Sequence, residues 1–129
     1  MGKAVLFISI LLLLGFGCAK SPLTMEKISF QTSDGITIVG NWYAAPESKR
    51  FVLLLHMMPA SKESWHPLAE ALQTAGVASL AIDFRGHGES IASQGGALDY
   101  KKFSDTEQQA KMRDVEAAVA WLKEKGARE

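Results

Sequence analysis

Two apolar runs, each followed by a polar loop, constrain the fold of this chain most. Residues 51–55 (Phe-Val-Leu-Leu-Leu) lead into His56, and residues 77–82 (Val-Ala-Ser-Leu-Ala-Ile) lead into Asp83. Short, continuously apolar runs are typical of strands that are buried on both faces of a sheet. The segment between them, 65–75, has apolar residues at helical spacing. We therefore expect a parallel strand pair joined by a right-handed helical crossover.

The segment before these strands predicts an antiparallel hairpin. Residues 27–32 and 36–43 are rich in β-branched and aromatic side chains and flank the turn sequence Ser33-Asp34-Gly35. Glycine after aspartate supplies the positive φ angle that a tight turn between strands requires. A polar loop at 46–50 leads from the hairpin into the first buried strand.

Capping signals mark two helices. Ser64 is expected to cap the helix at 65–75, with Pro67 in its first turn and Gly76 as its stop. A second helix is expected after a loop at 84–103.

The second helix starts with a capping box and ends at a glycine. Ser104 and Glu107 have capping-box spacing, and Gly126 is expected to end the helix. Its apolar stripe consists of Met112, Val115, Val119 and Leu122.

The first seventeen residues predict export. Lys3 precedes an uninterrupted apolar run at 4–14, which is too short for an ordinary membrane span and is typical of a secretory signal. Cys18, the only cysteine, follows this run and Gly17, which resembles the lipobox of bacterial lipoproteins.

This resemblance implies a signal peptide at 1–17, lipidation of Cys18, and a lipid-anchored tether at 18–25. The partial domain would then occupy 26–129 of a protein on the periplasmic side of a bacterial membrane or at the cell surface. The alternative is a signal sequence in which the cysteine is incidental.

The charge distribution argues against a nucleic-acid partner. Fourteen Lys and Arg residues balance fourteen Asp and Glu residues, and no basic cluster is larger than Lys101-Lys102. Binding through phosphate contacts requires a basic patch, which this sequence lacks. The sequence implies no metal and no organic cofactor.

The loop after the second buried strand carries the most specific signature. Its sequence at 83–90 is Asp-Phe-Arg-Gly-His-Gly-Glu-Ser. Together with the order hairpin, strand, helix, strand, loop and helix over 26–126, it resembles the amino-terminal half of the α/β-hydrolase superfamily, in its esterase, lipase or serine-aminopeptidase-like branches. The resemblance implies an α/β fold with an incomplete sheet.

The resemblance assigns a role to the turn after the first buried strand. His56-Met57-Met58-Pro59 matches the His-Gly-x-Pro turn of the family, with Met57 in place of the glycine. This implies that the Met58 backbone N–H is a donor of the oxyanion hole. His56 is expected to stabilise the turn and His87 to be structural.

The catalytic triad of the family, a nucleophile, a base and an acid, is not present in the sequence. The family places its nucleophile on a Gly-x-Ser-x-Gly elbow after a fifth strand, and the nearest mimic here, around Ser93, lacks the leading glycine. The nucleophile, the acid and the base would all lie beyond this chain.

We therefore expect the amino-terminal fragment of an exported serine hydrolase for carboxylic esters or related acyl bonds, inactive alone. A small acyl substrate would bind only after completion by the missing half. The alternatives are a short non-catalytic lipoprotein that uses half of the scaffold for binding or assembly, and a split enzyme completed by a second polypeptide. Because residues 51–55 would form an open apolar edge, the chain alone is also expected to aggregate or to fold only in part.

Overall fold

The computed structural model describes residues 22–128. The expected signal peptide at 1–17, the lipidation of Cys18 and the first part of the tether lie outside the described residues. No helix within 22–128 is long and apolar enough to span a bilayer.

Four strands form one mixed sheet with the order β1-β2-β4-β3. The strands are β1 Met25–Gln31, β2 Thr37–Tyr43, β3 Phe51–Leu55 and β4 Ala78–Ile82. β1 and β2 form the expected antiparallel hairpin, with Gly35 at φ 78° in its turn. β3 and β4 pair in parallel, as their apolar runs predict. Within residues 22–128, β3 is an edge strand.

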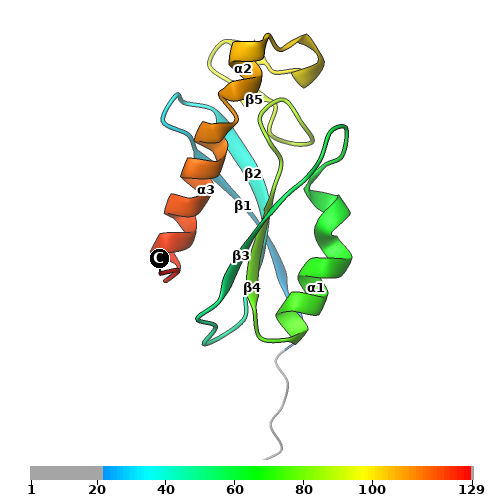
Figure 1. The fold of residues 1–129 in the computed structure, drawn as a ribbon, viewed down its shortest axis with the longest axis vertical. Coiled ribbons are helices and arrows are strands. Elements are labelled where there is room, and N and C mark those ends of the chain that lie inside the picture. Colours follow the sequence, from blue (N-terminus) through cyan, green and yellow to red (C-terminus); the bar gives the residue numbers. More distant parts are fainter. Residues whose placement is uncertain (1–21, 129) are drawn as a thin grey trace, which may run out of the picture.

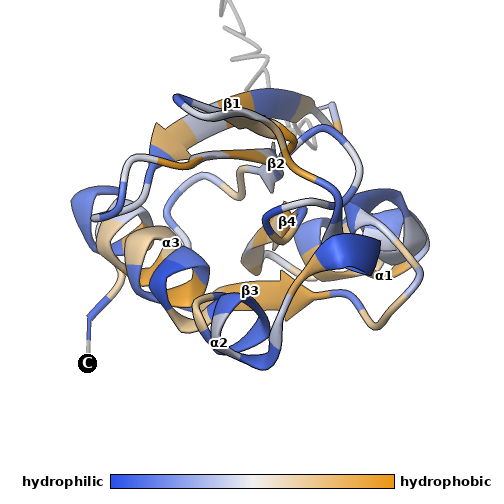
Figure 2. Ribbon diagram, turned by 90° about the horizontal axis from the view of Figure 1, so that it is seen from above, coloured by the Kyte–Doolittle hydropathy of each residue, from blue (hydrophilic) through white to orange (hydrophobic). Residues whose placement is uncertain are grey.

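One long helix covers each face of the sheet (Figures 1 and 2). α1, His66–Thr74, provides the crossover between β3 and β4, and α3, Met112–Glu124, packs on the opposite face. The loop after β4 contains a small hairpin, β5 Ala92–Ser93 and β6 Gly96–Ala97, and a 3-10 turn at Tyr100–Lys102. The sequence did not indicate these short elements.

The start of α1 differs from the prediction. A 3-10 turn, Lys62–Trp65, precedes the helix, and Ser64 lies inside this turn. The Ser64 hydroxyl donates to the carbonyl of Ser61 and does not cap α1. The cap prediction was wrong because the chain already turns before Pro67, which takes an early position in α1.

The helix expected after Ser104 is divided into two. Ser104 and Glu107 form the predicted capping box, but this starts only the short α2, Asp105–Gln109. Around Lys111 the backbone N–H groups bond to carbonyls three residues earlier, which separates α2 from α3. The predicted apolar stripe is only partly buried, because Met112 and Val119 are exposed while Asp114 is fully buried.

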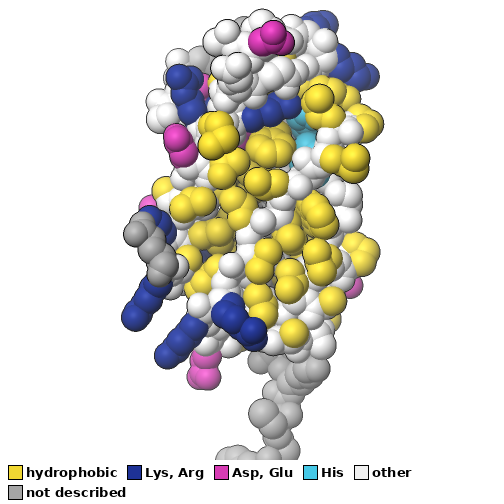
Figure 3. Space-filling model, in the orientation of Figure 1, with side chains coloured by type: hydrophobic (Ala, Val, Ile, Leu, Met, Phe, Trp, Pro, Cys, Tyr) yellow, Lys and Arg dark blue, Asp and Glu magenta, His cyan; other side chains and the backbone are white. Residues whose placement is uncertain are grey.

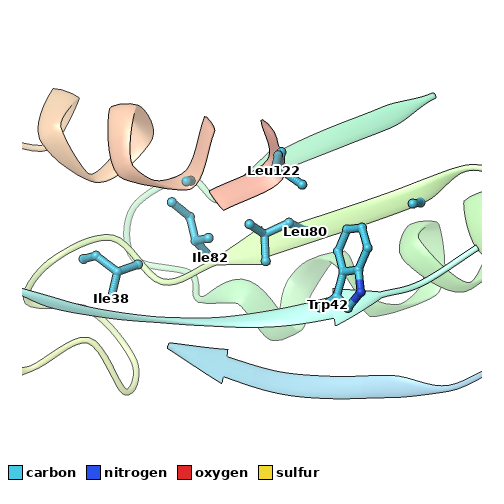
Figure 4. Close-up of a cluster of buried hydrophobic side chains, with 7 residues drawn as sticks. Ile38, Trp42, Leu80, Ile82 and Leu122 are labelled. Atoms are coloured by element: carbon cyan, nitrogen blue, oxygen red, sulfur yellow. The ribbon is translucent and has the colours of Figure 1, made fainter. Parts of the chain in front are cut away.

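The main core lies between the sheet and α3 (Figure 4). Trp42 of β2 packs edge-on against Trp121 of α3, with ring centroids 5.2 Å apart. The buried members of this cluster are Ile38, Trp42, Ala78, Leu80, Ile82, Ala118 and Leu122. A smaller cluster on the α1 side contains Tyr43, Leu54, Ala69 and Ala81. Because β4 is buried along its full length, it holds both layers together.

Candidate functional site

The turn after β4 is built around the carboxylate of Asp83. Its oxygens accept the backbone N–H groups of Lys62 and Glu89, at 2.8 and 2.9 Å. Gly88 has φ 49°, and a Cβ at this position would collide with the Asp83 carboxylate. The glycine is therefore required twice, by its backbone angle and by its neighbour.

Lys62 ties this turn to the segment before α1. Its buried ammonium contacts three carboxylates, those of Glu63, Asp83 and Glu89, at 2.8, 2.8 and 2.7 Å. Burial acts to lower the pKa of Lys62, but the hydrogen bonds to Asp83, Glu63 and Glu89 outweigh burial and raise the pKa above its usual value. Sequence reasoning missed this role, because Lys62 stands in no recognisable motif and is 21 residues from Asp83 along the chain.

Arg85 connects the loop after β4 with both the hairpin and α3. Its backbone N–H and its Nε donate to the carboxylate of Asp114, at 2.9 and 2.8 Å, and its Nη1 lies 2.7 Å from Asp34. Burial acts to lower the pKa of Arg85, but the hydrogen bonds to Asp34 and Asp114 raise it above its usual value. The hydrogen bond from Arg85 in turn is the main cause that lowers the pKa of Asp34. Arg85 is therefore a structural cation.

His56 stabilises the ends of the two parallel strands. Its Nδ1–H donates to the Met57 carbonyl at 3.0 Å, and its Nε2 accepts the Phe84 N–H at 3.1 Å. Both ring nitrogens are thus engaged with backbone groups. This agrees with the expectation that His56 stabilises a turn.

His87 is buried between aromatic rings. Its imidazole stacks on Tyr100 with centroids 3.8 Å apart and lies 4.8 Å from the ring of His56. Burial, followed by the charge of Lys111 and the proximity of His56, lowers the pKa of His87 to about 4. The neutral form therefore predominates near pH 7. Within residues 22–128 no carboxylate is paired with His87, and a packing role accounts for its position.

Met57 and Met58 form the exposed turn after β3. Their exposed fractions are 77% and 55%, and the Met58–Pro59 peptide bond is cis. The Met58 N–H has no hydrogen-bond partner among residues 22–128. Its location at the carboxyl end of β3, before α1, is where an oxyanion donor is expected in such a scaffold.

No serine hydroxyl within residues 22–128 is hydrogen-bonded to a histidine. Ser90 Oγ donates to the Asp83 carbonyl, and Ser93 Oγ donates to the Gly96 carbonyl within the small β5–β6 hairpin. Ser93 thus lies in a two-residue strand and not on a strand-to-helix elbow. Over the same residues, 22–128, no cluster of His, Cys, Asp and Glu could hold a metal ion.

His66 is the first residue of α1. Its Nδ1 is 2.9 Å from the Tyr43 hydroxyl and its Nε2 is 3.4 Å from Glu70, one turn along the helix. Neither contact of His66 involves Met57 or Met58. The sequence did not predict the contact with Tyr43.

An apolar groove runs between the free edge of β3 and α3. It encloses about 300 Å³ and is lined by Lys49, Phe51, Leu53, Val119, Leu122, Lys123, Ala127 and Arg128. Figure 3 shows hydrophobic side chains gathered on this face of the molecule, with Lys and Arg side chains at its lower margin. The face that carries the β3 edge is therefore apolar with a basic margin.

The family is shown by the match of residues 50–125 to the alpha/beta hydrolase fold model. This chain belongs to the α/β-hydrolase fold family. An esterase of Pyrococcus furiosus, Pf2001, superimposes with a TM-score of 0.62 at 28% identity, covering 79% of this chain and 37% of the esterase.

Two other solved structures also superimpose on this chain. An epoxide hydrolase from an endophytic Streptomyces gives a TM-score of 0.59 at 28% identity, covering 80% of this chain and 28% of its own. For an esterase of Exiguobacterium antarcticum, at 19% identity, the TM-score is 0.59 over 76% of this chain and 32% of that one, which shows the shared fold alone. No curated protein sequence matches the chain.

The chain spans 37%, 28% and 32% of the length of these three structures, respectively. It is a partial α/β-hydrolase that is related to esterases.

Proposed function

We propose that this chain is the amino-terminal part of an exported serine hydrolase that cleaves carboxylic esters or related acyl bonds. Its part in the reaction is to supply one side of the oxyanion hole. The unpartnered N–H of Met58, at the carboxyl end of β3, is the observation that chiefly supports this role. The similarity to esterases supports the class of reaction.

The contribution of Met58 follows from the chemistry of acyl transfer. When a serine attacks an ester carbonyl, the carbonyl oxygen becomes negatively charged, and N–H groups already aimed at it stabilise the transition state. In this fold one donor follows the nucleophile and the other lies in the loop between the third strand and the first helix. One such donor lowers the barrier by about 3 kcal/mol. His56 fixes this loop by bonding to Met57 and Phe84, so the N–H is held in place before a substrate arrives.

The rest of the catalytic machinery would be supplied by residues outside this chain. The edge of β3 and the groove beside α3 offer an unpaired strand edge and an apolar surface for a further strand and helix. We propose that 22–128 alone are inactive for this reason.

The amino-terminal sequence supports the location of the enzyme. Lys3, the apolar run at 4–14 and Cys18 are the basis for proposing a signal peptide and a lipid anchor, with the domain on the periplasmic side of a bacterial membrane or at the cell surface. Incorporation of labelled palmitate into the full chain, and its loss in Cys18→Ala, tests the anchor. Incorporation that persists in Cys18→Ala would contradict it.

Sequencing of the coding DNA past codon 129 tests the function first. An in-frame or shifted extension that encodes a strand followed by Gly-x-Ser-x-Gly supports the proposal, and a separate downstream frame with these features indicates a split enzyme. A stop followed by unrelated sequence contradicts it and favours a non-catalytic binding module.

The longer product then provides the activity test. It should hydrolyse a p-nitrophenyl ester and lose this activity when the elbow serine is replaced by alanine. The 129-residue chain provides the matched control and should be inactive.

A further inference from the structure

The segment that leads back to the proposed lipid anchor joins the domain at one end of the sheet. β1, β3 and β4 run in the same direction, and paired residues on neighbouring strands form rows across the sheet. The row nearest to the start of these three strands consists of Met25, Tyr43, Ser79 and Val52. Just before it, the carbonyl of Thr24 accepts a hydrogen bond from Gln73 at 2.7 Å. The amino-terminal segment is therefore attached where the strands begin.

The candidate site lies at the opposite end of the sheet. The Met57–Met58 turn follows the last residue of β3, and the loop that carries His87 follows the last residue of β4. Lys111, just before α3, is also at this end, since its Nζ lies 3.3 Å from Nε2 of His87. α3 therefore runs from the candidate site back towards the end where the amino-terminal segment is attached.

Exposed cations from two segments gather at the attachment end. The loop before β3 starts beside Thr24, because Gln73 also donates to the Ala44 carbonyl at 2.7 Å. This loop and the end of α3 line the same groove, and Figure 3 shows Lys and Arg side chains at its lower margin. The exposed cations of the two segments are Lys49, Arg50, Lys123, Lys125 and Arg128. We call this part of the surface the basic end.

The basic end has a net positive charge, although the whole chain is neutral. Within residues 22–128, three carboxylates accompany its five cations, those of Glu26, Glu47 and Glu124. No ion pair up to 4.0 Å within these residues includes any of four of the cations, Lys49, Arg50, Lys125 and Arg128. Sequence reasoning missed this surface because its two segments are far apart in the chain.

We propose that the basic end docks on the anionic phospholipid headgroups of the membrane that holds the lipid anchor. From Cys18 to Thr24 the chain has seven residues, which span at most about 25 Å when fully extended. The anchor therefore keeps the attachment end near the bilayer, where anionic headgroups attract Lys and Arg side chains. Leu23 and Met25, 49% and 48% exposed, lie beside the attachment point and add apolar groups that suit the membrane interface.

Docking in this orientation turns the candidate site away from the bilayer. The inference rests on the proposed function for the anchor and for the reaction. It adds that substrates reach the Met58 turn from the aqueous side, so that esters dissolved in water, and not phospholipids of the same bilayer, are the substrate class.

Lysine acylation on vesicles tests this orientation without a variant, without hydrolysis and without lipidation. The full 129-residue chain is mixed with vesicles of phosphatidylcholine alone, or of equal parts phosphatidylcholine and phosphatidylglycerol. Trace acetic anhydride is added, and mass spectrometry gives the acylation rate at each lysine. The apolar run at 4–14 is able to enter both kinds of vesicle, so the comparison between the two lipid compositions is the result. Palmitate incorporation tests the anchor separately, so failure of docking and failure of the anchor are distinguishable.

Anionic vesicles should slow acylation of Lys49 and Lys125 at least about threefold relative to neutral vesicles, because headgroups cover them in the docked state. Lys101 and Lys102 are next to Tyr100, which stacks on His87 at the candidate-site end. Their rates, and that of Lys111, should be the same on both vesicles. Equal slowing at the two ends, or no slowing at Lys49 and Lys125, would overturn the proposal.

Charge reversal provides a second test. Lys49→Glu combined with Arg50→Glu changes two exposed side chains that form no ion pair within residues 22–128, so the variant should fold. The matched control, Lys101→Glu combined with Lys102→Glu, reverses two charges at the candidate-site end.

Cosedimentation with the anionic vesicles measures the binding of both variants. Binding should weaken at least about tenfold in the first variant and less than about threefold in the control. The difference should disappear at about 1 M salt, where the Debye length is only about 3 Å. Equal binding of the two variants at low salt, or a difference that persists at high salt, would contradict docking through the basic end.

Discussion

Replacement of Asp114 by alanine should remove much of the stability of this domain. The Asp114 side chain is fully buried on α3, and its carboxylate accepts the backbone N–H and the Nε of Arg85 while lying 2.8 Å from Nη2. Without it, the buried guanidinium keeps only the partly exposed Asp34, and one buried backbone N–H loses its acceptor. Breaking one partner of a buried ion pair costs about 3–5 kcal/mol.

This loss is large relative to the total free energy of unfolding of such a domain. A domain of this size is stable by about 5–15 kcal/mol in total, so Asp114→Ala should shift the urea midpoint strongly or leave the chain unfolded. The assay is urea unfolding at low protein concentration, followed by far-ultraviolet circular dichroism and by tryptophan fluorescence, which reports on Trp42 and Trp121 in the core. The two signals should change together if unfolding is cooperative.

Arg113→Ala provides the matched control. Arg113 also contacts Asp34, at 2.9 Å, but its side chain is half exposed. Surface ion pairs contribute about 0–1 kcal/mol, so this variant should unfold close to the unmodified chain. If Asp114→Ala costs less than about 1 kcal/mol, or no more than Arg113→Ala, the Arg85–Asp114 ion pair does not stabilise the contact between the loop and α3.

Three further predictions concern pH, backbone geometry and the sheet edge. The pKa of His87 is lowered from 6.5 to about 4, so between these pH values the unfolded chain binds more protons than the folded chain. The free energy of unfolding should therefore be highest above pH 6.5 and should fall by up to about 3 kcal/mol towards pH 4. Denaturant titrations at several pH values should show this loss, and His87→Gln should reduce it. Gly88→Ala should destabilise the chain by about 1–3 kcal/mol more than Gly76→Ala. Both glycines have positive φ angles, but only at Gly88 would a Cβ collide with Asp83. Equal urea midpoints of the two variants would show that the contact between Gly88 and the Asp83 carboxylate does not matter for stability. Leu53→Lys on the β3 edge should reduce the self-association measured by sedimentation velocity, because a charge at an apolar edge hinders pairing with another chain. Ser29→Lys on β1 is the control and should leave self-association unchanged. Equal self-association of the two variants would argue against β3 as the contact between chains.

Local patterns predicted most of the sheet. The hairpin around Gly35, the parallel pair 51–55 and 77–82, and the capping box at Ser104 are each encoded within a few residues, and the structure contains all of them. The predicted cap at Ser64 failed because the preceding 3-10 turn uses that hydroxyl locally.

The candidate site was less predictable. His56 and Met58 could be placed by their position after a buried strand and by resemblance to a family turn. The contacts of Lys62 and Lys111 could not, since neither residue lies in a recognisable motif, and each meets partners that are more than twenty residues away in the chain. Likewise, the sequence predicts only a turn at Asp34, although its carboxylate also pairs with Arg85 and Arg113.

The sequence by itself therefore determined the strands, the crossover helix, the family and the position of the candidate donor at Met58. Hydrophobic periodicity, turn residues and capping groups act over short distances along the chain, so they can be read without a structure. The tertiary structure alone decided which charges became buried partners, as Arg85 and Asp114 did, and that the ammonium of Lys111 lies against the imidazole of His87. The physical reason is that electrostatic pairing depends on distance in space and on burial, and both are fixed only when β4, α3 and the loops between them have packed together.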